Sequence, residues 1–266
     1  MIPKIIHYCW IGKKPLPPLA KKCIASWQRL MPDYEIKRWD ETNYDFKKNK
    51  FMVNAYARKK WGFVPDYARL DIIYNYGGIY LDTDVEVLKS FDEFLKYPAF
   101  CGFESEHFIN FGHGFGSEKG NKIIKQLMRP YETMDFSLNN EILKQASLYS
   151  KIQMEKWQKE GLVPSPLLQT QILAKEFGLK QNNTRHSLGG IEVFPSIYFC
   201  PRDKYFAPIY DERAYSVHHF MGSWIPAQTK IKVKLVRLLR GCLGSKTVDF
   251  LLQINRKIKN ILKKLS

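Results

Sequence analysis

The stretch GGIYLDTDV, residues 77–85, decides how this chain is expected to fold. Two adjacent glycines are typical of a helix end followed by a tight turn, because glycine adopts backbone conformations that other residues avoid. The apolar residues 79–81 form a run so short that it fits only a buried strand. Asp82 and Asp84 follow at the end of this strand, and ligands of open α/β sheets bind at strand ends.

The segments before this stretch alternate between strand and helix. Residues 4–10 and 34–39 are short apolar or β-branched runs that predict strands, whereas 19–30 has apolar residues at helical spacing. Helices are also predicted at 51–61 and from Pro65 up to the two glycines. A strand, helix, strand start is typical of a parallel sheet. The sequence therefore predicts an α/β fold with a mainly parallel central sheet flanked by helices.

The second half of the chain mixes both kinds of element. Its predicted strands and helices are, in chain order, 99–103, 122–128, 167–177, 191–194 and 215–220. The glycine-rich residues 108–120 lack the Gly-Lys-Ser/Thr ending of a phosphate-binding P-loop. We expect them to form a mobile lid or an acceptor loop.

The composition predicts a folded protein with reduced cysteines. With 266 residues, 45% of them hydrophobic, the chain can fill the core of one large α/β domain. Its five cysteines are scattered and show no Cys-x-x-Cys spacing, so neither a disulfide framework nor a zinc site is indicated. The first residues lack the features of a signal peptide, and no run of eighteen apolar residues occurs. We therefore expect a cytoplasmic location without a membrane span.

The net charge of +16 is concentrated in the C-terminal segment. Residues 230–266 contain eleven Lys and Arg against one acidic residue, which gives this segment a formal charge of +10. From Phe250 onward apolar residues recur at helical spacing, with basic residues over the rest. We expect a large domain at 1–228 and a basic amphipathic helical tail at 229–266 that binds an anionic membrane surface. The alternative is a helix that packs on the domain.

Asp82 and Asp84 are candidate metal ligands. Alternate side chains of an extended segment point the same way, so the two carboxylates are expected to converge. Adjacent carboxylates repel each other unless a cation lies beside them, and such oxygen ligands suit Mg²⁺ or Mn²⁺. An ion of this kind can neutralise the charge of a diphosphate leaving group. The Asp-x-Asp pattern alone also occurs on solvated surfaces, and only the preceding turn and strand sharpen the prediction.

Three segments, in the expected order, resemble glycosyltransferase family 32. Residues 66–85, DYARLDIIYNYGGIYLDTDV, resemble the donor-site signature of that family. Residues 2–12, IPKIIHYCWIG, resemble its first strand, and residues 218–224, HHFMGSW, resemble its C-terminal motif. The family includes yeast Och1-type mannosyltransferases and bacterial capsule and lipopolysaccharide sugar transferases, with clostridial glucosylating toxins as distant relatives.

The resemblance implies a GT-A fold for the domain at 1–228 and a transfer that retains the anomeric configuration. The expected reaction moves a hexose from a nucleotide sugar to a saccharide or lipid-linked saccharide in the synthesis of a surface polysaccharide. A UDP-hexose is favoured as the donor, with GDP-mannose as the alternative, and Mn²⁺ or Mg²⁺ is the expected ion. A lipid-linked acceptor and the basic tail together imply peripheral binding to the cytoplasmic membrane, and no nucleic acid is expected as a partner.

The same resemblance assigns residues to the site. The expected metal ligands are Asp82, Asp84 and His218, with His219 as the alternative because neighbours on a strand face opposite ways. The residues expected to act in catalysis are Asp66, Arg69, Asp82 and Asp84. The residues expected around the nucleotide sugar are Cys9, Trp10, Asp66, Arg69, Tyr80, Asp82, Ser223 and Trp224.

The resemblance implies roles for most of this set. Trp10 would lie along the base, Tyr80 against the nucleoside, and Asp66 and Arg69 at the sugar hydroxyls and phosphate. Asp82 would contact either the ribose or the metal, and Asp84 would bind the metal directly. Ser165 stands where the family usually has a glycine facing the donor sugar, so the sugar contacts there stay open.

The implied mechanism uses no carboxylate nucleophile. The acceptor hydroxyl would attack on the side from which the leaving group departs, and the departing phosphate oxygen would take its proton. Arg69 and Ser223 would stabilise that phosphate together with the ion, while Trp224 closes over the diphosphate.

Each of these residues also has an ordinary structural explanation. A tryptophan in an apolar strand is usually a core residue, and an aspartate after a proline at a helix start usually caps the helix. An arginine on a helix commonly pairs with a nearby acid such as Asp71. A histidine beside apolar residues is more often hydrogen-bonded than bound to a metal.

Two other classes of protein were weighed. A haloacid-dehalogenase-type phosphatase also places aspartates after a strand, the first as a nucleophile. Such an enzyme needs a later acidic pair, yet the acids after residue 200 are scattered at Asp203, Asp211, Glu212 and Asp249. A basic membrane-binding or nucleic-acid-binding protein would explain the charge but not the three motifs.

Overall fold

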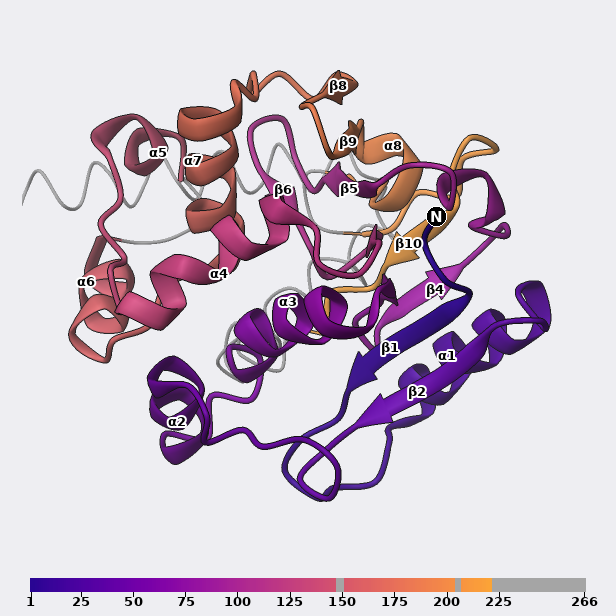
Figure 1. The fold of residues 1–266 in the computed structure, drawn as a ribbon, viewed down its shortest axis with the longest axis horizontal. Helices are drawn as coiled ribbons and strands as arrows, with labels where there is room; N and C mark the ends of the chain where they lie inside the picture. Colours follow the sequence, from indigo (N-terminus) through magenta and orange to yellow (C-terminus); the bar gives the residue numbers. More distant parts are fainter. Residues whose placement is uncertain (147–150, 204–206, 222–266) are drawn as a thin grey trace, which may run out of the picture. The chain divides into compact units, whose positions relative to one another are not determined.

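The computed structural model describes residues 1–146, 151–203 and 207–221, all within one compact unit, Met1–Ser223 (Figure 1). The elements in chain order are β1 (Ile5–Cys9), α1 (Pro18–Leu30), β2 (Glu35–Trp39), α2 (Lys50–Ala57), α3 (Val64–Tyr76), β3 (Gly78–Tyr80), β4 (Val85–Val87), the 3₁₀-helix η1 (Asp92–Phe94), β5 (Ala99–Phe103), β6 (Ile109–Asn110), β7 (Phe115–Ser117), α4 (Lys122–Thr133), α5 (Asn140–Gln145), α6 (Lys151–Lys159), α7 (Ser165–Phe177), β8 (His186–Ser187), β9 (Glu192–Phe194), α8 (Ser196–Phe199) and β10 (Ser216–His218). In these ranges no helix is long and apolar enough to cross a bilayer. The predicted domain boundary at 228 and the tail at 229–266 lie outside the described residues.

The central sheet has the order β2-β1-β3-β7-β5-β9-β8, with β6 paired to β5. Strands β2, β1 and β3 are mutually parallel, β7 is antiparallel to both β3 and β5, and β9 is parallel to β5. In the described residues, five strands of this sheet therefore run in one direction and β6, β7 and β8 in the other. The predicted α/β fold with a mainly parallel sheet is confirmed.

Helices cover both faces of the sheet. Side chains of alternate strand residues point to opposite faces, and in β3 Ile79 and Tyr80 accordingly enter two different hydrophobic clusters. The cluster around Tyr80 contains apolar residues of α2, α3, α4 and α7. The cluster around Ile79 contains Cys23 and Trp27 of α1 and Phe94 of η1. Figure 1 accordingly shows β1 running between α3 and α1.

The turn at Gly77 and Gly78 is what directs the chain into β3. Helix α3 ends at Gly77, whose φ is 70°, and Gly78 follows with a φ of 107°. Both angles lie in the region that favours glycine. A Cβ atom on Gly78 would also lie 2.7 Å from the carbonyl oxygen of Ile5. The double glycine therefore lets β3 pack directly against β1, as the sequence predicted.

The buried histidine His7 ties this turn to the first two strands. Trp39 Nε1 of β2 donates a hydrogen bond of 3.0 Å to His7 Nδ1, and His7 Nε2 lies 2.8 Å from the carbonyl oxygen of Gly77. A neutral ring that carries its proton on Nε2 satisfies both contacts. Burial lowers the pKa of His7 to about 4.

The prediction of a mobile lid at residues 108–120 was wrong. Residues 108–117 are buried and supply β6 and β7 to the central sheet. The glycines serve close packing: a Cβ on Gly114 would lie 2.5 Å from the Phe199 ring, and one on Gly116 would lie 2.5 Å from the Phe100 ring. A glycine-rich run signals either a loop or tightly packed backbone, and here it is the second.

Acid should destabilise the protein through His7. The unfolded state takes up a proton below the ordinary pKa of 6.5, whereas the folded state resists it down to about 4, so this contribution is complete above pH 6.5 and is lost as the pH falls towards 4. We expect His7 to account for about 2 kcal/mol of the loss in unfolding free energy between pH 7.5 and pH 5. Urea denaturation of wild type and His7→Gln at both values measures this difference. An equal pH dependence in the two proteins would contradict it.

Candidate metal and donor site

The Asp82–Asp84 segment is a turn, not the extended strand that was predicted. The amide of Val85 donates to the carbonyl oxygen of Asp82 at 3.0 Å, and the amide of Asp82 donates to the carbonyl oxygen of Gly112 at 2.7 Å. The chain must turn here because β3 belongs to the central sheet, whereas β4 pairs with β10 in a separate two-stranded sheet. The two carboxylates nevertheless converge, as expected, through the turn and not through strand alternation.

Asp82, Asp84 and His218 form one cluster. Each offers one ligand atom, and these atoms lie within 4.8 Å of one another, the one group of this kind among the described residues. Asp84 and His218 are buried, and Asp82 is half-buried. Strand β10 is antiparallel to β4 with His218 opposite Val85, which brings a residue from near the end of the described chain to the turn. Two carboxylates and an imidazole suit Mn²⁺ or Mg²⁺, so the residues present fit the ion that the sequence implied.

The two neighbouring histidines have different partners. His218 Nε2 lies 3.1 Å from Asp84 Oδ1, whereas His219 Nε2 lies 2.9 Å from Glu86 Oε2. The structure therefore places His218, and not the alternative His219, in the cluster with the aspartates.

Asp84 and His218 shift each other's pKa in opposite directions. Burial alone would raise the pKa of Asp84, but His218 and the amide of Met221 hold it below its ordinary value. Burial alone would lower the pKa of His218, but the Asp84 carboxylate raises it well above its ordinary value. The contact between the two is therefore a charge-assisted hydrogen bond. Burial raises the pKa of Asp82, and Arg69 acts against this shift.

The buried Arg69 joins two acids. Its guanidinium lies 3.1 Å from Asp66 Oδ1, one helical turn earlier, and 3.4 Å from Asp82 Oδ1. Its pairing with Asp66 is the ordinary helical one, but its contact with Asp82 ties α3 to the metal cluster. Asp71, the other acid considered, pairs with Lys48 instead.

Asp66 is a buried member of this network and not a simple helix cap. The N-cap position of α3 is occupied by Phe63, which makes no side-chain capping hydrogen bond. Asp66 instead accepts a hydrogen bond of 2.9 Å from Ser165 Oγ at the start of α7. Burial raises the pKa of Asp66 to about 7, although Arg69 opposes the shift. Ser165, at the position where a glycine was expected, thus contacts a site residue.

Tyr80 and Cys9 do not face the donor as predicted. Tyr80 is 1% exposed, so its ring is not available to pack on a nucleoside, and the Arg69 guanidinium lies 5.2 Å from the ring centre. Cys9 is also buried, and burial raises the pKa of its thiol to about 12. The Tyr80 ring therefore faces Arg69 inside the core. The prediction for these two residues was wrong because a residue at the end of a strand can pack in the core instead of lining a binding site.

Trp10 keeps a partly exposed position at the end of β1. Its side chain is half-buried, and its indole N–H donates to the carbonyl oxygen of Lys14 at 2.5 Å. Its role along the base stays a prediction. Ser223 and Trp224, expected over the diphosphate, lie outside the described residues.

The comparisons with known proteins identify the N-terminal part of this site. Residues 17–101 match the family described as "Glycosyltransferase sugar-binding region containing DXD motif". The chain is therefore similar to this family over residues 17–101, about a third of its length. The match includes Asp66, Arg69, Asp82 and Asp84, whereas His218 lies beyond it and is placed by the structure.

Among curated relatives, the chain is 34% identical over 136 residues to inositol phosphoceramide mannosyltransferase 3 of Schizosaccharomyces pombe, covering 48% of this chain and 36% of that protein. It is 32% identical over 104 residues to the mannosyl phosphorylinositol ceramide synthase of Saccharomyces cerevisiae, covering 38% and 27%. The chain thus spans about a third of the length of these relatives. Among solved structures, the PaToxG glycosyltransferase is 20% identical with a TM-score of 0.46, covering 66% of this chain and 70% of that one.

Two contacts near the aspartate turn were missed from the sequence. Gly112 accepts the Asp82 amide, and a Cβ on Gly112 would lie 2.2 Å from Asp82 Oδ2, so only glycine fits beside the turn. Glu86, two residues after Asp84, holds His219. The sequence pattern of the glycines at 112–116 was interpreted as a loop, and nothing in the sequence around Glu86 indicated its contact with His219.

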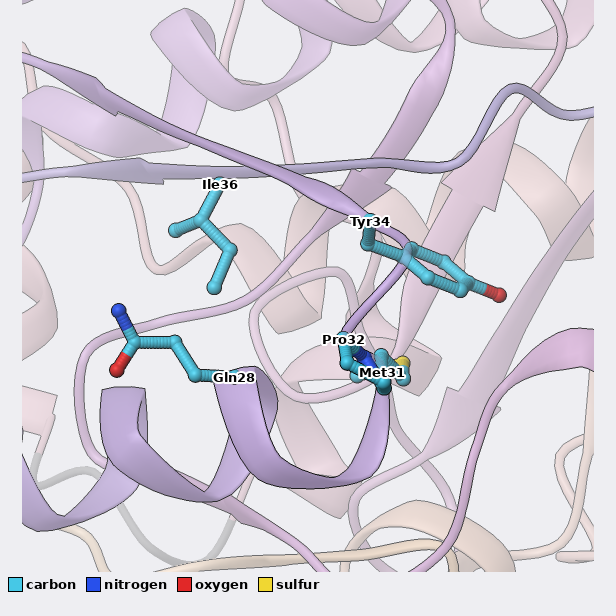
Figure 2. Close-up of a pocket in the computed structure, with 5 residues that line it drawn as sticks. All are labelled: Gln28, Met31, Pro32, Tyr34 and Ile36. Carbon is cyan, nitrogen blue, oxygen red and sulfur yellow. The ribbon is translucent and has the colours of Figure 1, made fainter.

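A separate pocket lies between the end of α1 and β2 (Figure 2). It has a volume of about 340 Å³ and is lined by Gln28, Met31, Pro32, Tyr34 and Ile36. Its lining includes no carboxylate, imidazole or thiol, so it offers no chemistry comparable with that of the aspartate cluster.

Binding of Mn²⁺ should release a proton from His218. A histidine binds a metal through a nitrogen that has lost its proton, and the pKa of His218 is raised well above its ordinary value. Raising the pH therefore favours the bound state, and we expect affinity to increase up to about tenfold per pH unit below that pKa. Calorimetric titration with MnCl₂ in buffers of different ionisation enthalpy counts the protons. Release of no proton between pH 6 and pH 7 would contradict the assignment of His218.

Proposed function

We propose that this protein is a metal-dependent glycosyltransferase that uses a nucleotide-sugar donor. The observation that carries the proposal is the cluster of Asp82, Asp84 and His218 beside the buried pair Asp66 and Arg69. All of these except His218 lie in the stretch that matches the sugar-binding region with a DXD motif. Metal ligands alone would suit many enzymes. Their combination with this family region supports sugar transfer.

The residues present suit the departure of a nucleoside diphosphate. Asp82, Asp84 and His218 would hold Mn²⁺ or Mg²⁺, which supplies positive charge for the leaving diphosphate when it is bound. Arg69 adds a guanidinium whose position is fixed by Asp66 and Asp82, and a charge held in advance needs no reorganisation during the reaction. Ser165 in turn orients Asp66.

The transferred sugar is proposed to be a hexose. The two yeast relatives are named for mannosyl transfer and for inositol phosphoceramide or its mannosylated form. These names support mannose as the sugar and a lipid-borne acceptor. The resemblance described first favoured a UDP-hexose, so both UDP-hexoses and GDP-mannose belong in a donor screen. Retention of anomeric configuration, which NMR of the product tests directly, is part of the same proposal.

The acceptor is proposed to be a glycan or lipid-linked glycan, reached from the cytoplasmic face of a membrane to which the basic tail binds. The support for the tail is its charge and its helical apolar spacing. Flotation of the protein with anionic vesicles, with and without residues 229–266, tests this part. The phosphatase alternative has no support in the family match.

Replacement of Asp84 should abolish donor turnover. We expect Asp84→Asn to reduce Mn²⁺-dependent nucleotide release at least about 100-fold, because it removes a charged ligand while keeping the side-chain size. Asp71→Asn is the matched control, since Asp71 is 7% exposed and Asp84 8% exposed, but Asp71 pairs with Lys48 away from the cluster. Release of nucleotide from a panel of UDP- and GDP-sugars is the measurement. Equal rates in Asp84→Asn and wild type would refute the proposal.

A further inference from the structure

The four residues that follow Val217 form a turn that wraps around Asp84. His218 Nε2 contacts Asp84 Oδ1 at 3.1 Å, and the amide of Met221 donates to Asp84 Oδ2 at 2.7 Å. The amide of His219 donates to the carbonyl oxygen of Asp84 at 2.9 Å. One short segment thus binds both carboxylate oxygens and the backbone of a single aspartate.

This turn contains a strained residue. Phe220 has a φ of 49°, in the left-handed region that residues other than glycine rarely adopt. Such a conformation costs free energy and persists where the surroundings hold it in place. The ring of Phe220 packs on the ring of His218, with centres 4.1 Å apart. The turn at 218–221 therefore requires anchors on both sides of Phe220.

Met221 supplies the anchor after Phe220, and Glu86 supplies the one before it. Glu86 lies on β4, and its carboxylate contacts His219 Nε2 at 2.9 Å, Lys22 Nζ at 3.0 Å and the Tyr210 hydroxyl at 3.2 Å. The pairing of β10 with β4 ends at His218, so the Glu86–His219 contact carries the attachment beyond the last paired residue.

The support beneath Glu86 is rigid. Helix α1, which carries Lys22, is fixed to β4 by a hydrogen bond of 2.8 Å from Trp27 Nε1 to the carbonyl oxygen of Val85 and by one of 2.9 Å from the amide of Val87 to Ser26 Oγ. Glu86 therefore connects the strained turn to a helix and a strand that are themselves firmly joined.

We propose that Glu86 and His219 are a positioning pair that holds the 218–221 turn closed on Asp84 and thereby raises the affinity of the site for a divalent cation. The proposal rests on the metal site of the proposed function. Neither residue contacts the ion in this account. They act by fixing His218 and the Met221 amide, and residues that orient metal ligands typically change metal affinity 10- to 100-fold when replaced.

The test compares His219→Phe, Glu86→Gln and Glu86→Ala with wild type. We expect His219→Phe and Glu86→Ala to weaken Mn²⁺ binding about tenfold, followed by the EPR signal of free Mn²⁺, and Glu86→Gln to have a smaller effect because one oxygen acceptor remains. Hydrogen–deuterium exchange at the amide of Met221 should become faster in the same order, and this second readout does not depend on the metal.

Glu192→Ala is the matched control for a general loss of stability. Glu192 and Glu86 side chains are 13% and 12% exposed, both lie on strands, and both pair with a basic residue. Glu192 pairs with Arg185 and lies on β9 of the central sheet, whereas Glu86 lies on β4 of the separate two-stranded sheet. We expect this variant to leave Mn²⁺ affinity and Met221 exchange within about twofold of wild type.

The outcomes separate this inference from the proposed function. If wild type binds Mn²⁺ and the folded His219→Phe and Glu86→Ala variants bind it equally well, the positioning pair is refuted while the metal site stands. If exchange at Met221 is the same in all variants, the pair is likewise refuted. If wild type binds no Mn²⁺ and transfers no sugar, the proposed function fails first, and the affinity claim fails with it.

Discussion

The arrangement of the site follows from placing two carboxylates close together in a poorly solvated turn. Asp82 and Asp84 repel each other, and burial penalises their charged forms. Each aspartate therefore has its own partner that stabilises its charged form. Arg69 from α3 lies against Asp82, and His218 from β10 lies against Asp84. A fold that brings a helix and a distant strand to one turn is required to keep these two acids ionised.

The same requirement explains why the preceding sheet is packed so closely. The turn stays in place because the Asp82 amide is fixed to Gly112 in the connection between β6 and β7, where no side chain would fit. On its other side, β3 is fixed to β1 through Gly78 and His7. The glycines near the site thus serve rigidity: each removes a side chain so that backbone can approach backbone. A site held this way has its charges in position before any ligand arrives.

Local patterns of sequence were sufficient to predict the strands β1, β2, β3, β5, β9 and β10, the double-glycine turn and the convergence of Asp82 and Asp84, but not the strands β4, β6, β7 and β8. The resemblance to the family was sufficient to predict Asp66, Arg69 and His218 as the other members of the site. What could not be predicted depends on contacts between distant segments. Ser165 reaches Asp66 only because α7 begins beside α3, and the choice of His218 over His219 depends on the register of β10 against β4. Tyr80 was misjudged because both faces of β3 are covered by core residues, which the sequence of so short a strand does not reveal.

Under the proposed function, the charges of the cluster also give a physical reason for a metal-dependent donor affinity. With both aspartates ionised, Asp82, Asp84, Arg69 and a protonated His218 are neutral in total, and an ionised Asp66 beside Arg69 adds a negative charge, so this set attracts a diphosphate weakly. Addition of a divalent cation with loss of the His218 proton makes the net charge at the same place more positive by one. An anionic donor therefore gains affinity from the ion, and by linkage the ion gains the same factor from the donor. A turn that presents Asp84 and His218 in a fixed geometry lowers the cost of the first of these two binding steps, so the packing of residues 218–221 bears on donor binding as well as on the ion.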